Sequence, residues 1–422
     1  MTSRPTALAL ALLLASGCAP PPDELAAPEA AAEPARRPGE WVVTDRVGAV
    51  QLHATGDEAS LPVLALGAGT LTLAFDVKGQ DLGRPLDVSF VHTDRQGRED
   101  LLPSEYLTGF ERDNILDFER SGASVAVPYV HYRYRFPNAS VGFAVSGNYR
   151  LRVTDPDGAL LLEAPFYVSE ELAEVDLAFG ATVQGGSVGF AVQPAARVRP
   201  AARIQEFDGS RYTVCFARNG RTDRMRCAPE PSLVDLALFQ FYLPRQDAFP
   251  EQGALFGVDL GFLGLNTEVV DVDPAARPPT ATLDLDYADF GGDVRDAVLA
   301  SVPLIGSVYR DVGRADVDAE YVDVTFRFVP PEGRPSSRRV FVVGSFNGWT
   351  ARPGDELAWV EAERRYEGTV PVKQGRYVYA YTGAPSATPG LGTPSLFTAY
   401  VYLADPRRFT DRLVAVRSAV AR

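Results

Sequence analysis

Histidine and cysteine, which supply much of the catalytic and metal chemistry in proteins, are scarce in this sequence. The 422 residues include three of each. His53, His92 and His131 stand far apart, and no two of them have the i, i+4 spacing that places a pair of zinc ligands on one element. We therefore expect no metal and no cofactor. His131, between Tyr129 and Tyr132 in a strand pattern, is interpreted as a packed structural residue.

The same scarcity argues against hydrolase chemistry. Residues 185–189 match the G-x-S-x-G pattern, which requires a strand before the serine, a helix after it and a histidine later in the chain. Here all three histidines precede Ser187, and the next residues have the pattern of a strand. We interpret the segment as a glycine-rich turn and expect a protein that is not an enzyme.

Basic residues are outnumbered by acidic ones. The chain has 41 Lys and Arg against 55 Asp and Glu, a net charge of -14. Such a balance argues against binding to nucleic acid or to anionic lipid. Asp284, Asp286 and Asp289 form an acidic cluster without the central glycine and final glutamate of a calcium loop, so we expect them on solvated strand faces.

Long apolar runs are missing beyond the first residues. An apolar run at 7–14 follows Arg4, and three small residues precede Cys18. The run is too short to span a membrane and is typical of an export signal. Small residues ending in glycine before a cysteine are the form of a bacterial lipobox, which predicts a lipoprotein signal peptide at 1–17 and a lipid on Cys18. The alternative is an ordinary signal peptide with an incidental cysteine.

The rest of the chain has the pattern of an all-β protein. Residues 18–40 are rich in Ala, Pro and Glu and predict a flexible tether. Short alternating runs separated by turn residues follow, without a long helical stripe, and they predict two or three consecutive Ig-like β-sandwich domains. The expected boundaries are an N-terminal sandwich at 41–169, a second β domain at 170–273, a linker at 274–280 and a C-terminal sandwich at 281–422. One short helix is expected, at 293–300.

Two cysteines remain in the mature body. Cys215 and Cys227 flank the turn signal Asn219-Gly220. An even pair in an exported protein predicts a disulfide that closes a hairpin loop. Two buried free thiols are the alternative.

The most informative stretch lies between residues 102 and 153. It contains, in this order, Glu105, Tyr106, Gly109, Phe110, Tyr129, His131, Tyr132, Pro137, Asn138, Gly147, Asn148 and Tyr149. The order and spacing of these motifs resemble the N-terminal domain of the type IX secretion system plug proteins. Near the end, residues 400–402 and 411–414 are similar to the closing segment of that family, whereas 249–256 keeps only the outline of a central family motif.

The resemblance implies a non-enzymatic component of the type IX protein secretion system. Proteins of that family lie on the periplasmic side of the outer membrane and close the pore of a large β-barrel translocon. The implied partners are therefore this translocon and, through a lipid on Cys18, the outer membrane. An outer-membrane lipoprotein facing the periplasm, with stacked sandwiches and an exposed, tyrosine-rich surface of mixed charge, is the expectation.

A second resemblance concerns residues 340–381. They are similar to early-set Ig-like modules that bind glycogen or starch on an aromatic face. Trp349 matches the first aromatic position, but Ala380 stands where those modules have a lysine, and no tryptophan follows. Trp349 and Trp359 are thus possible glycan contacts, although we interpret Trp349 as a partly buried sandwich residue. The alternative function is a glycan-binding outer-membrane lipoprotein.

Overall fold

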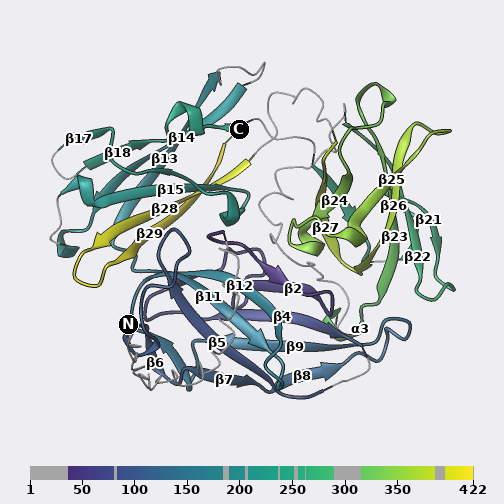
Figure 1. Ribbon diagram of the computed structural model, residues 1–422, viewed down its shortest axis with the longest axis horizontal. Coiled ribbons are helices and arrows are strands. Elements are labelled where there is room, and N and C mark those ends of the chain that lie inside the picture. The colour runs from purple at the N-terminus through teal and green to yellow at the C-terminus, as the bar shows by residue number, and fades with distance from the viewer. Residues whose placement is uncertain are drawn as a thin grey trace, which may run out of the picture. The chain divides into compact units, whose positions relative to one another are not determined.

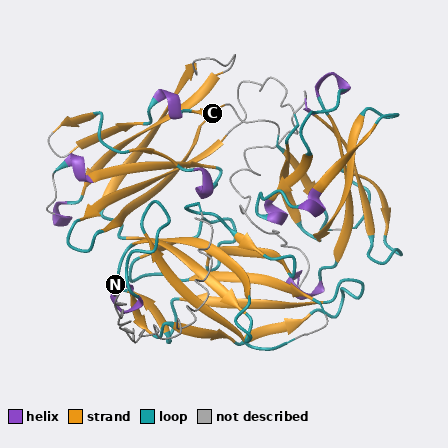
Figure 2. Cartoon of the chain, in the orientation of Figure 1, coloured by secondary structure: helices purple, strands orange, loops and turns teal. Residues whose placement is uncertain are grey.

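The computed structural model describes most of the chain after the predicted tether. The described residues are 37–79, 83–183, 190–204, 208–235, 238–250, 255–261, 263–288, 315–384 and 395–421. The predicted signal peptide, Cys18, Ser187 and the helix expected at 293–300 lie outside them. Strands dominate the described part, and its α-helices are the single turns α1 (Pro103–Tyr106) and α3 (Ala315–Asp318). The predicted all-β sandwich class is confirmed (Figures 1 and 2).

The first sandwich packs two sheets around an aromatic core. One sheet has the order β1-β12-β11-β5-β7, with β3 parallel to β12, and the other has the order β2-β4-β9-β8. A two-stranded pair of β6 and β10 follows α1. The strands are β1 (Val42–Val43), β2 (Val47–Ala54), β3 (Val63–Ala65), β4 (Leu71–Lys78), β5 (Leu86–Thr93), β6 (Leu107–Gly109), β7 (Arg112–Ile115), β8 (Asp117–Arg120), β9 (Tyr129–Phe136), β10 (Val141–Phe143), β11 (Gly147–Thr154) and β12 (Leu160–Ser169).

Alternating side chains explain why these segments are strands. Every second residue of β5, beginning at Leu86, is buried, and the same is true of β11. The two strands pair so that Leu151 lies opposite Phe90 and Val153 opposite Val88. Their apolar residues therefore share one face and form the core, as a two-residue period requires.

The second sandwich is assembled from two distant parts of the chain. One sheet contains β13 (Ala173–Val183), β14 (Phe190–Pro200), β18 (Leu238–Tyr242) and β17 (Leu233–Asp235), with β19 (Phe249–Pro250) paired to β14. The opposite sheet has the order β16 (Arg226–Ala228), β15 (Tyr212–Arg218), β28 (Ser395–Asp405) and β29 (Thr410–Ala421). Of the last two strands, yellow in Figure 1, β28 lies beside the teal strand β15 and β29 pairs with β28.

The assignment of these last strands to the C-terminal sandwich is therefore wrong. Tyr400 in β28 pairs with Cys215 in β15, and the buried residues Phe397 and Val401 join the core that contains Phe216. Alternation identifies β28 as a strand but not its partner, because nearly two hundred residues separate the paired positions. A single sequence has no local signal for a pairing of that range.

The third sandwich lies between the two parts of the second in sequence. Its strands follow the order β20-β27-β24-β25-β26-β23-β22-β21. They are β20 (Phe256–Asp259), β21 (Val269–Asp273), β22 (Thr280–Tyr287), β23 (Tyr321–Val329), β24 (Val340–Gly344), β25 (Glu356–Val360), β26 (Arg365–Lys373) and β27 (Arg376–Thr382).

The linker predicted at 274–280 is instead the turn of a hairpin inside this sandwich. Asp273 in β21 pairs with Thr280 in β22, and the Asp273 side chain accepts hydrogen bonds from the backbone N–H groups of Ala275 and Ala276. Proline and aspartate have the same local effect in a linker and in a turn, so composition did not separate the two. In the described part of the chain, no helix is long and apolar enough to cross a membrane.

Phe136 tests the importance of the first core. Its ring is fully buried and lies 5.2 Å from the ring of Phe90 and 5.0 Å from that of Phe166. Phe136→Ala should lower the free energy of unfolding by about 3–5 kcal/mol, because it leaves a cavity in a packed core. Phe110→Ala, at a side chain 67% exposed, should change it by less than about 0.5 kcal/mol. Urea unfolding measures both, and similar losses for the two variants would contradict this core.

Candidate functional site

Several residues of the plug-like motifs are interior residues of the first sandwich. The Tyr106 hydroxyl donates to the carbonyl of Phe90 at 2.7 Å, and the Tyr149 hydroxyl donates to that of Val145 at 2.6 Å. Burial raises the pKa of Tyr106 to about 12 and that of Tyr149 well above its usual value. Tyr132 is also buried there and stacks on Phe75. These hydroxyls are fixed by the fold and stay protonated.

A second group of motif residues shapes turns. The Glu105 carboxylate accepts from the backbone N–H of Leu102 at the start of α1. Asn138, which follows Pro137, accepts from the backbone N–H groups of Ser140 and Val141 at 2.8 and 3.0 Å. These contacts satisfy backbone donors that a tight turn would otherwise leave unpaired.

Two motif glycines stand where a side chain would not fit. Gly109 has a φ of +99°, and a Cβ there would lie 2.1 Å from the carbonyl oxygen of Ser140. Gly147 has a φ of +146°, and a Cβ would lie 2.4 Å from Nε2 of His92. Positive φ and close approach both require glycine at these positions.

The strand β9 presents the remaining aromatic motif to two different neighbours. Val130, Tyr132 and Phe136 belong to the core of the first sandwich. Tyr129 and His131, on the other face of the strand, are also buried. Tyr129 donates to Ala319 of the third sandwich, and His131 contacts Asp76, which binds Lys373 of that sandwich. The motif Tyr129-Val130-His131-Tyr132 therefore combines a core face with a junction face, which explains why all four residues are buried.

The carboxylate of Asp76 is the centre of this first junction. It is fully buried, and Nζ of Lys373 in the third sandwich lies 2.8 Å from its Oδ2. Nδ1 of His131 lies 2.8 Å from its Oδ1. The Tyr321 hydroxyl, also from the third sandwich, donates to Oδ2 at 2.9 Å. Three polar partners thus surround one buried carboxylate.

Tyr129 extends the same junction. Its hydroxyl donates to the carbonyl of Ala319 at 2.7 Å, and Nζ of Lys373 lies 4.3 Å from the centre of its ring. Close by, the Ser121 hydroxyl donates to the carbonyl of Val317 at 2.6 Å. Burial, together with the Asp76 charge, raises the pKa of Tyr321 well above its usual value, so its hydroxyl remains a donor.

A second junction joins the first and second sandwiches. Nδ1 of His92 lies 2.6 Å from Asp100, whose other oxygen accepts from the Thr410 hydroxyl. Glu170 accepts from Nε of Arg412 at 2.8 Å. The motif residue Asn148 accepts from the Tyr402 hydroxyl at 2.9 Å. The segments that resemble the beginning and the end of the plug family therefore meet in space.

Other predicted site residues have structural surroundings. Cys215 and Cys227 form a disulfide between directly paired residues of β15 and β16. Asp286 is not a solvated residue, because it accepts from the hydroxyls of Tyr379 and Tyr381 at 2.8 and 2.6 Å, and burial raises its pKa to about 6. In the part of the chain that is described, no cluster of three His, Cys, Asp or Glu residues could hold a metal.

The two candidate sugar-binding tryptophans do not share a platform. Trp349 packs on Leu255 and Val378, whereas Trp359 packs on the interior of the third sandwich with its ring centre 5.0 Å from that of Tyr366. Trp359 also donates from Nε1 to Glu361 at 2.5 Å. Both indoles are partly buried.

The central residues of the first junction were missed in the sequence. Asp76 lies between Phe75 and Val77 in a strand that is buried along almost its whole length, and Lys373 ends the strand β26. A charged residue in the middle of a fully buried strand is a signal that a partner must be supplied from elsewhere. The identity of that partner is not readable, since it lies 297 positions away.

The fold and the junctions define a multidomain protein of three β-sandwiches, the third inserted in sequence within the second, that are tied together by buried polar contacts. Residues 47–170, almost the whole first sandwich, match the family of the type 9 secretion system plug protein 1st domain. This match supports the plug family and a role in type 9 secretion. No significant match was found among curated protein sequences.

Solved structures show where else this fold occurs. The chain is similar to a hypothetical protein from Parabacteroides merdae ATCC 43184, with a TM-score of 0.76 and 21% identity over 90% of this chain and 98% of that one. The likeness shows a shared fold. The trypsin-activated alpha-2-macroglobulin of Escherichia coli covers 92% of this chain and 24% of its own, but its TM-score of 0.20 and 10% identity support no conclusion.

Lys373→Met tests the first junction. Removing the ammonium leaves the buried Asp76 carboxylate without its charged partner. We expect the free energy of unfolding to fall by about 3–5 kcal/mol. Adding Asp76→Asn to the Lys373→Met variant should recover part of this loss, because the unpaired negative charge is then removed. The matched control is Arg199→Gln in an exposed pair with Glu174, which should cost at most about 1 kcal/mol. A Lys373→Met variant as stable as the original in urea would contradict the assignment.

Gly109→Ala tests the turn that precedes Phe110. Gly56 is the matched control, because its φ of +88° is similar and a Cβ there would meet nothing within 4 Å. Gly56→Ala should cost about 1–2 kcal/mol from backbone conformation alone. Gly109→Ala should cost at least about 1 kcal/mol more, since the Ser140 carbonyl belongs to the backbone and yields little. Equal thermal midpoints for the two variants would rule out the close contact.

Proposed function

We propose that the protein is a non-enzymatic plug of the type IX secretion system, which closes the periplasmic opening of an outer-membrane β-barrel translocon. The match of residues 47–170 to the first domain of the plug family carries the proposal. The positions of the motif residues add support, because Asn148 and Tyr129 hold the first sandwich to the other two.

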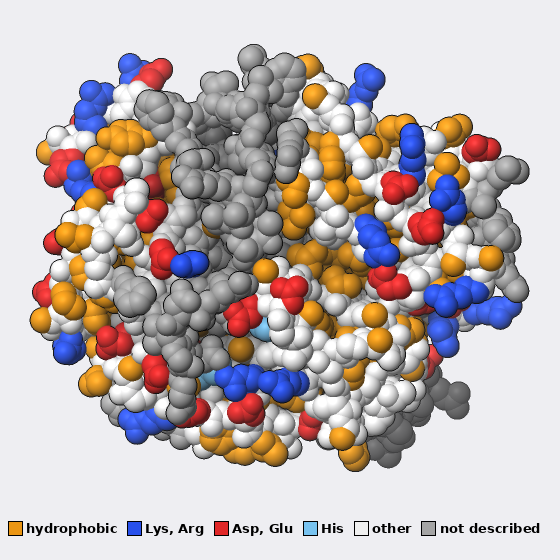
Figure 3. Space-filling model, turned by 180° about the vertical axis from the view of Figure 1, so that it is seen from behind, with side chains coloured by type: hydrophobic (Ala, Val, Ile, Leu, Met, Phe, Trp, Pro, Cys, Tyr) orange, Lys and Arg blue, Asp and Glu red, His pale blue; other side chains and the backbone are white. Residues whose placement is uncertain are grey.

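The contacts between the sandwiches suit a body that must obstruct an aqueous pore. Such a body has to resist deformation while its surface stays compatible with water and with reversible contacts. The junction around Asp76 is buried and polar, and its partners come from two sandwiches. Acidic and basic side chains are interspersed on the face shown in Figure 3, which provides a mixed-charge surface.

The expected tyrosine-rich surface is not present in the described residues. Most of the largest fully buried side chains are tyrosines, among them Tyr106, Tyr129 and Tyr149. These three tyrosines serve in cores and junctions, where the ring is buried and the hydroxyl has a partner. The surface that meets a translocon must therefore be made of other side chains.

Phe110 is the best candidate for such a contact. It is the exception among the aromatic motif residues, because its side chain is 67% exposed although Gly109 and Ser140 fix its backbone. An exposed aromatic ring on a fixed backbone is a typical anchor at protein interfaces. We assign Phe110 to the contact with the translocon.

A lipid on Cys18 would complete the arrangement. It would anchor the chain to the periplasmic side of the outer membrane, and a tether of residues 18–40 would let the sandwiches reach the barrel. Anchoring of this kind raises the local concentration of the plug near its pore without any further contact.

Affinity purification of the tagged full chain from solubilised outer membrane, followed by mass spectrometry, tests this function. We expect a large β-barrel translocon subunit in the eluate, and its absence would overturn the proposal. Phe110→Ala should lower recovery of that subunit several-fold, whereas Leu265→Ala, at another exposed apolar side chain, should not. If both variants capture the barrel equally well, the plug function is still supported, but Phe110 is not part of the contact.

A further inference from the structure

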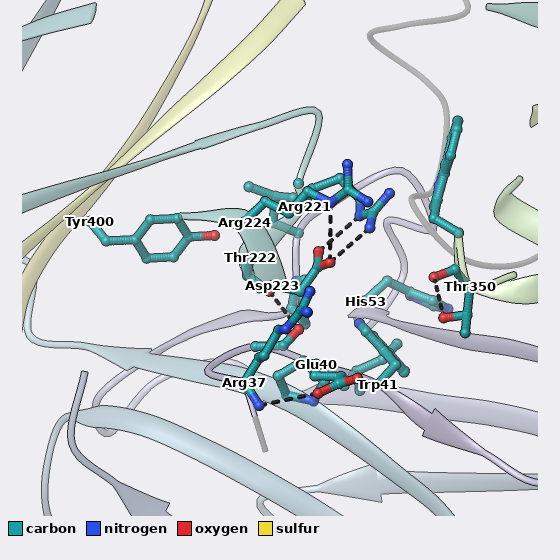
Figure 4. A pocket seen from close by; sticks show the side chains of 18 of the residues that line it. Arg37, Glu40, Trp41, His53, Arg221, Thr222, Asp223, Arg224, Thr350 and Tyr400 are labelled. Atoms are coloured by element: carbon teal, nitrogen blue, oxygen red, sulfur yellow. Dashed lines mark hydrogen bonds and ion pairs between the residues drawn. The ribbon is translucent and has the colours of Figure 1, made fainter. Parts of the chain in front are cut away.

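A pocket opens where all three sandwiches contribute side chains (Figure 4). The first sandwich supplies Trp41 and His53. The second supplies Arg221 and Arg224, from the single turn between β15 and β16, and Tyr400 from β28. The third supplies Trp349 and its neighbours. Indoles and charged groups that converge in one concave site are the usual features of a small-ligand pocket.

Three guanidinium groups line this pocket, and two of them share one carboxylate. Asp223 holds Arg221 through two contacts of 2.8 and 2.7 Å, and Nε of Arg224 lies 3.7 Å from the same carboxylate. Burial, and then the charge of Arg221, lowers the pKa of Arg224, and Arg37 contributes in the same direction. Arg221 and Arg224 therefore share the Asp223 carboxylate, and the Arg37 guanidinium is near enough to Arg224 to affect its pKa.

Two further carboxylates, Glu40 and Glu58, line the pocket, so the lining holds as many carboxylates as guanidinium groups. Glu40 accepts from the backbone N–H of Arg37 at 3.1 Å. Within the described part of the chain, neither Glu40 nor Glu58 lies within ion-pair distance of the Arg37 guanidinium. Their presence favours a ligand with a single negative charge over a multiply charged one, because each extra charge would be repelled.

The hydroxyl of Tyr400 points into the pocket and has no hydrogen-bond partner among the described residues. The side chain is fully buried. A buried hydroxyl without a partner is costly, and in native proteins it is a rare feature that calls for an explanation. Figure 4 shows it directed toward the side formed by Thr222, Asp223 and Arg224.

From this geometry we propose that the pocket binds a small organic acid, with its carboxylate on Arg37, Arg224 and the Tyr400 hydroxyl and its ring-shaped body against Trp41 and Trp349. Charge-assisted hydrogen bonds from guanidinium groups are the strongest that a carboxylate receives. The indoles provide the apolar surface that a ring requires. The site is independent of Phe110 and of the secretion role.

Calorimetric titration of the full chain with four probes tests the site. Benzoate and glucuronate each have a ring and a carboxylate. Glucose has the sugar ring of glucuronate without the charge, and inorganic phosphate has a negative charge without a ring. We expect at least one ring carboxylate to bind at least tenfold more tightly than glucose and phosphate, and which one binds identifies an aromatic or a sugar body. Binding of glucose or of phosphate at equal strength, or no binding of either carboxylate, would overturn the proposal.

Two variants localise the binding. Arg224→Gln should weaken it at least tenfold, whereas Arg334→Gln, at an arginine outside the pocket, should leave it unchanged. Tyr400→Phe should weaken it several-fold without lowering the unfolding midpoint of the free protein, because the hydroxyl has no partner to lose. Tyr242→Phe is its control. Unchanged binding in both pocket variants would place the ligand elsewhere.

Discussion

One buried carboxylate, that of Asp76, governs how the first sandwich is joined to the third. A charged group that is taken out of water is tolerated only when other groups replace the lost solvation. Here Lys373 and Tyr321 provide that replacement from the third sandwich, and His131 provides it from the first. The first sandwich alone would leave the carboxylate without two of these partners. The junction is thus chemically required, and it specifies which surfaces meet.

The motifs of the sequence acquire a common meaning in this setting. Motif residues such as Tyr132 and Tyr149 build the first core, whereas Tyr129 and Asn148 contact the neighbouring sandwiches and His131 holds the Asp76 carboxylate at the first junction. A motif of interior and junction residues preserves the geometry of the assembled sandwiches. Phe110 is exposed and is the aromatic motif residue that this explanation places neither in the core nor at a junction.

The sequence predicted strands well and their long-range partners poorly. Two-residue alternation in the sequence identified β4, β5, β11 and β23, and in the last three it matches a strand that buries one face against a core formed nearby. It did not separate the hairpin turn after Asp273 from a linker, and it did not predict that β28 would pair with β15. For the same reason the motif residues were recognised, but the partners of His131 and the convergence of Trp41, Tyr400 and Trp349 in one pocket were not. Such contacts depend on the assembled structure.

The return of β28 and β29 to the second sandwich has a consequence for the order of events during biosynthesis. The sheet that contains β15 lacks its neighbour until these last strands are available, while the whole third sandwich is formed from the intervening chain. A chain that emerges from its N-terminus therefore exposes the unpaired edge of β15 until β28 has emerged. Only a chain that includes β28 and β29 can close the second sandwich.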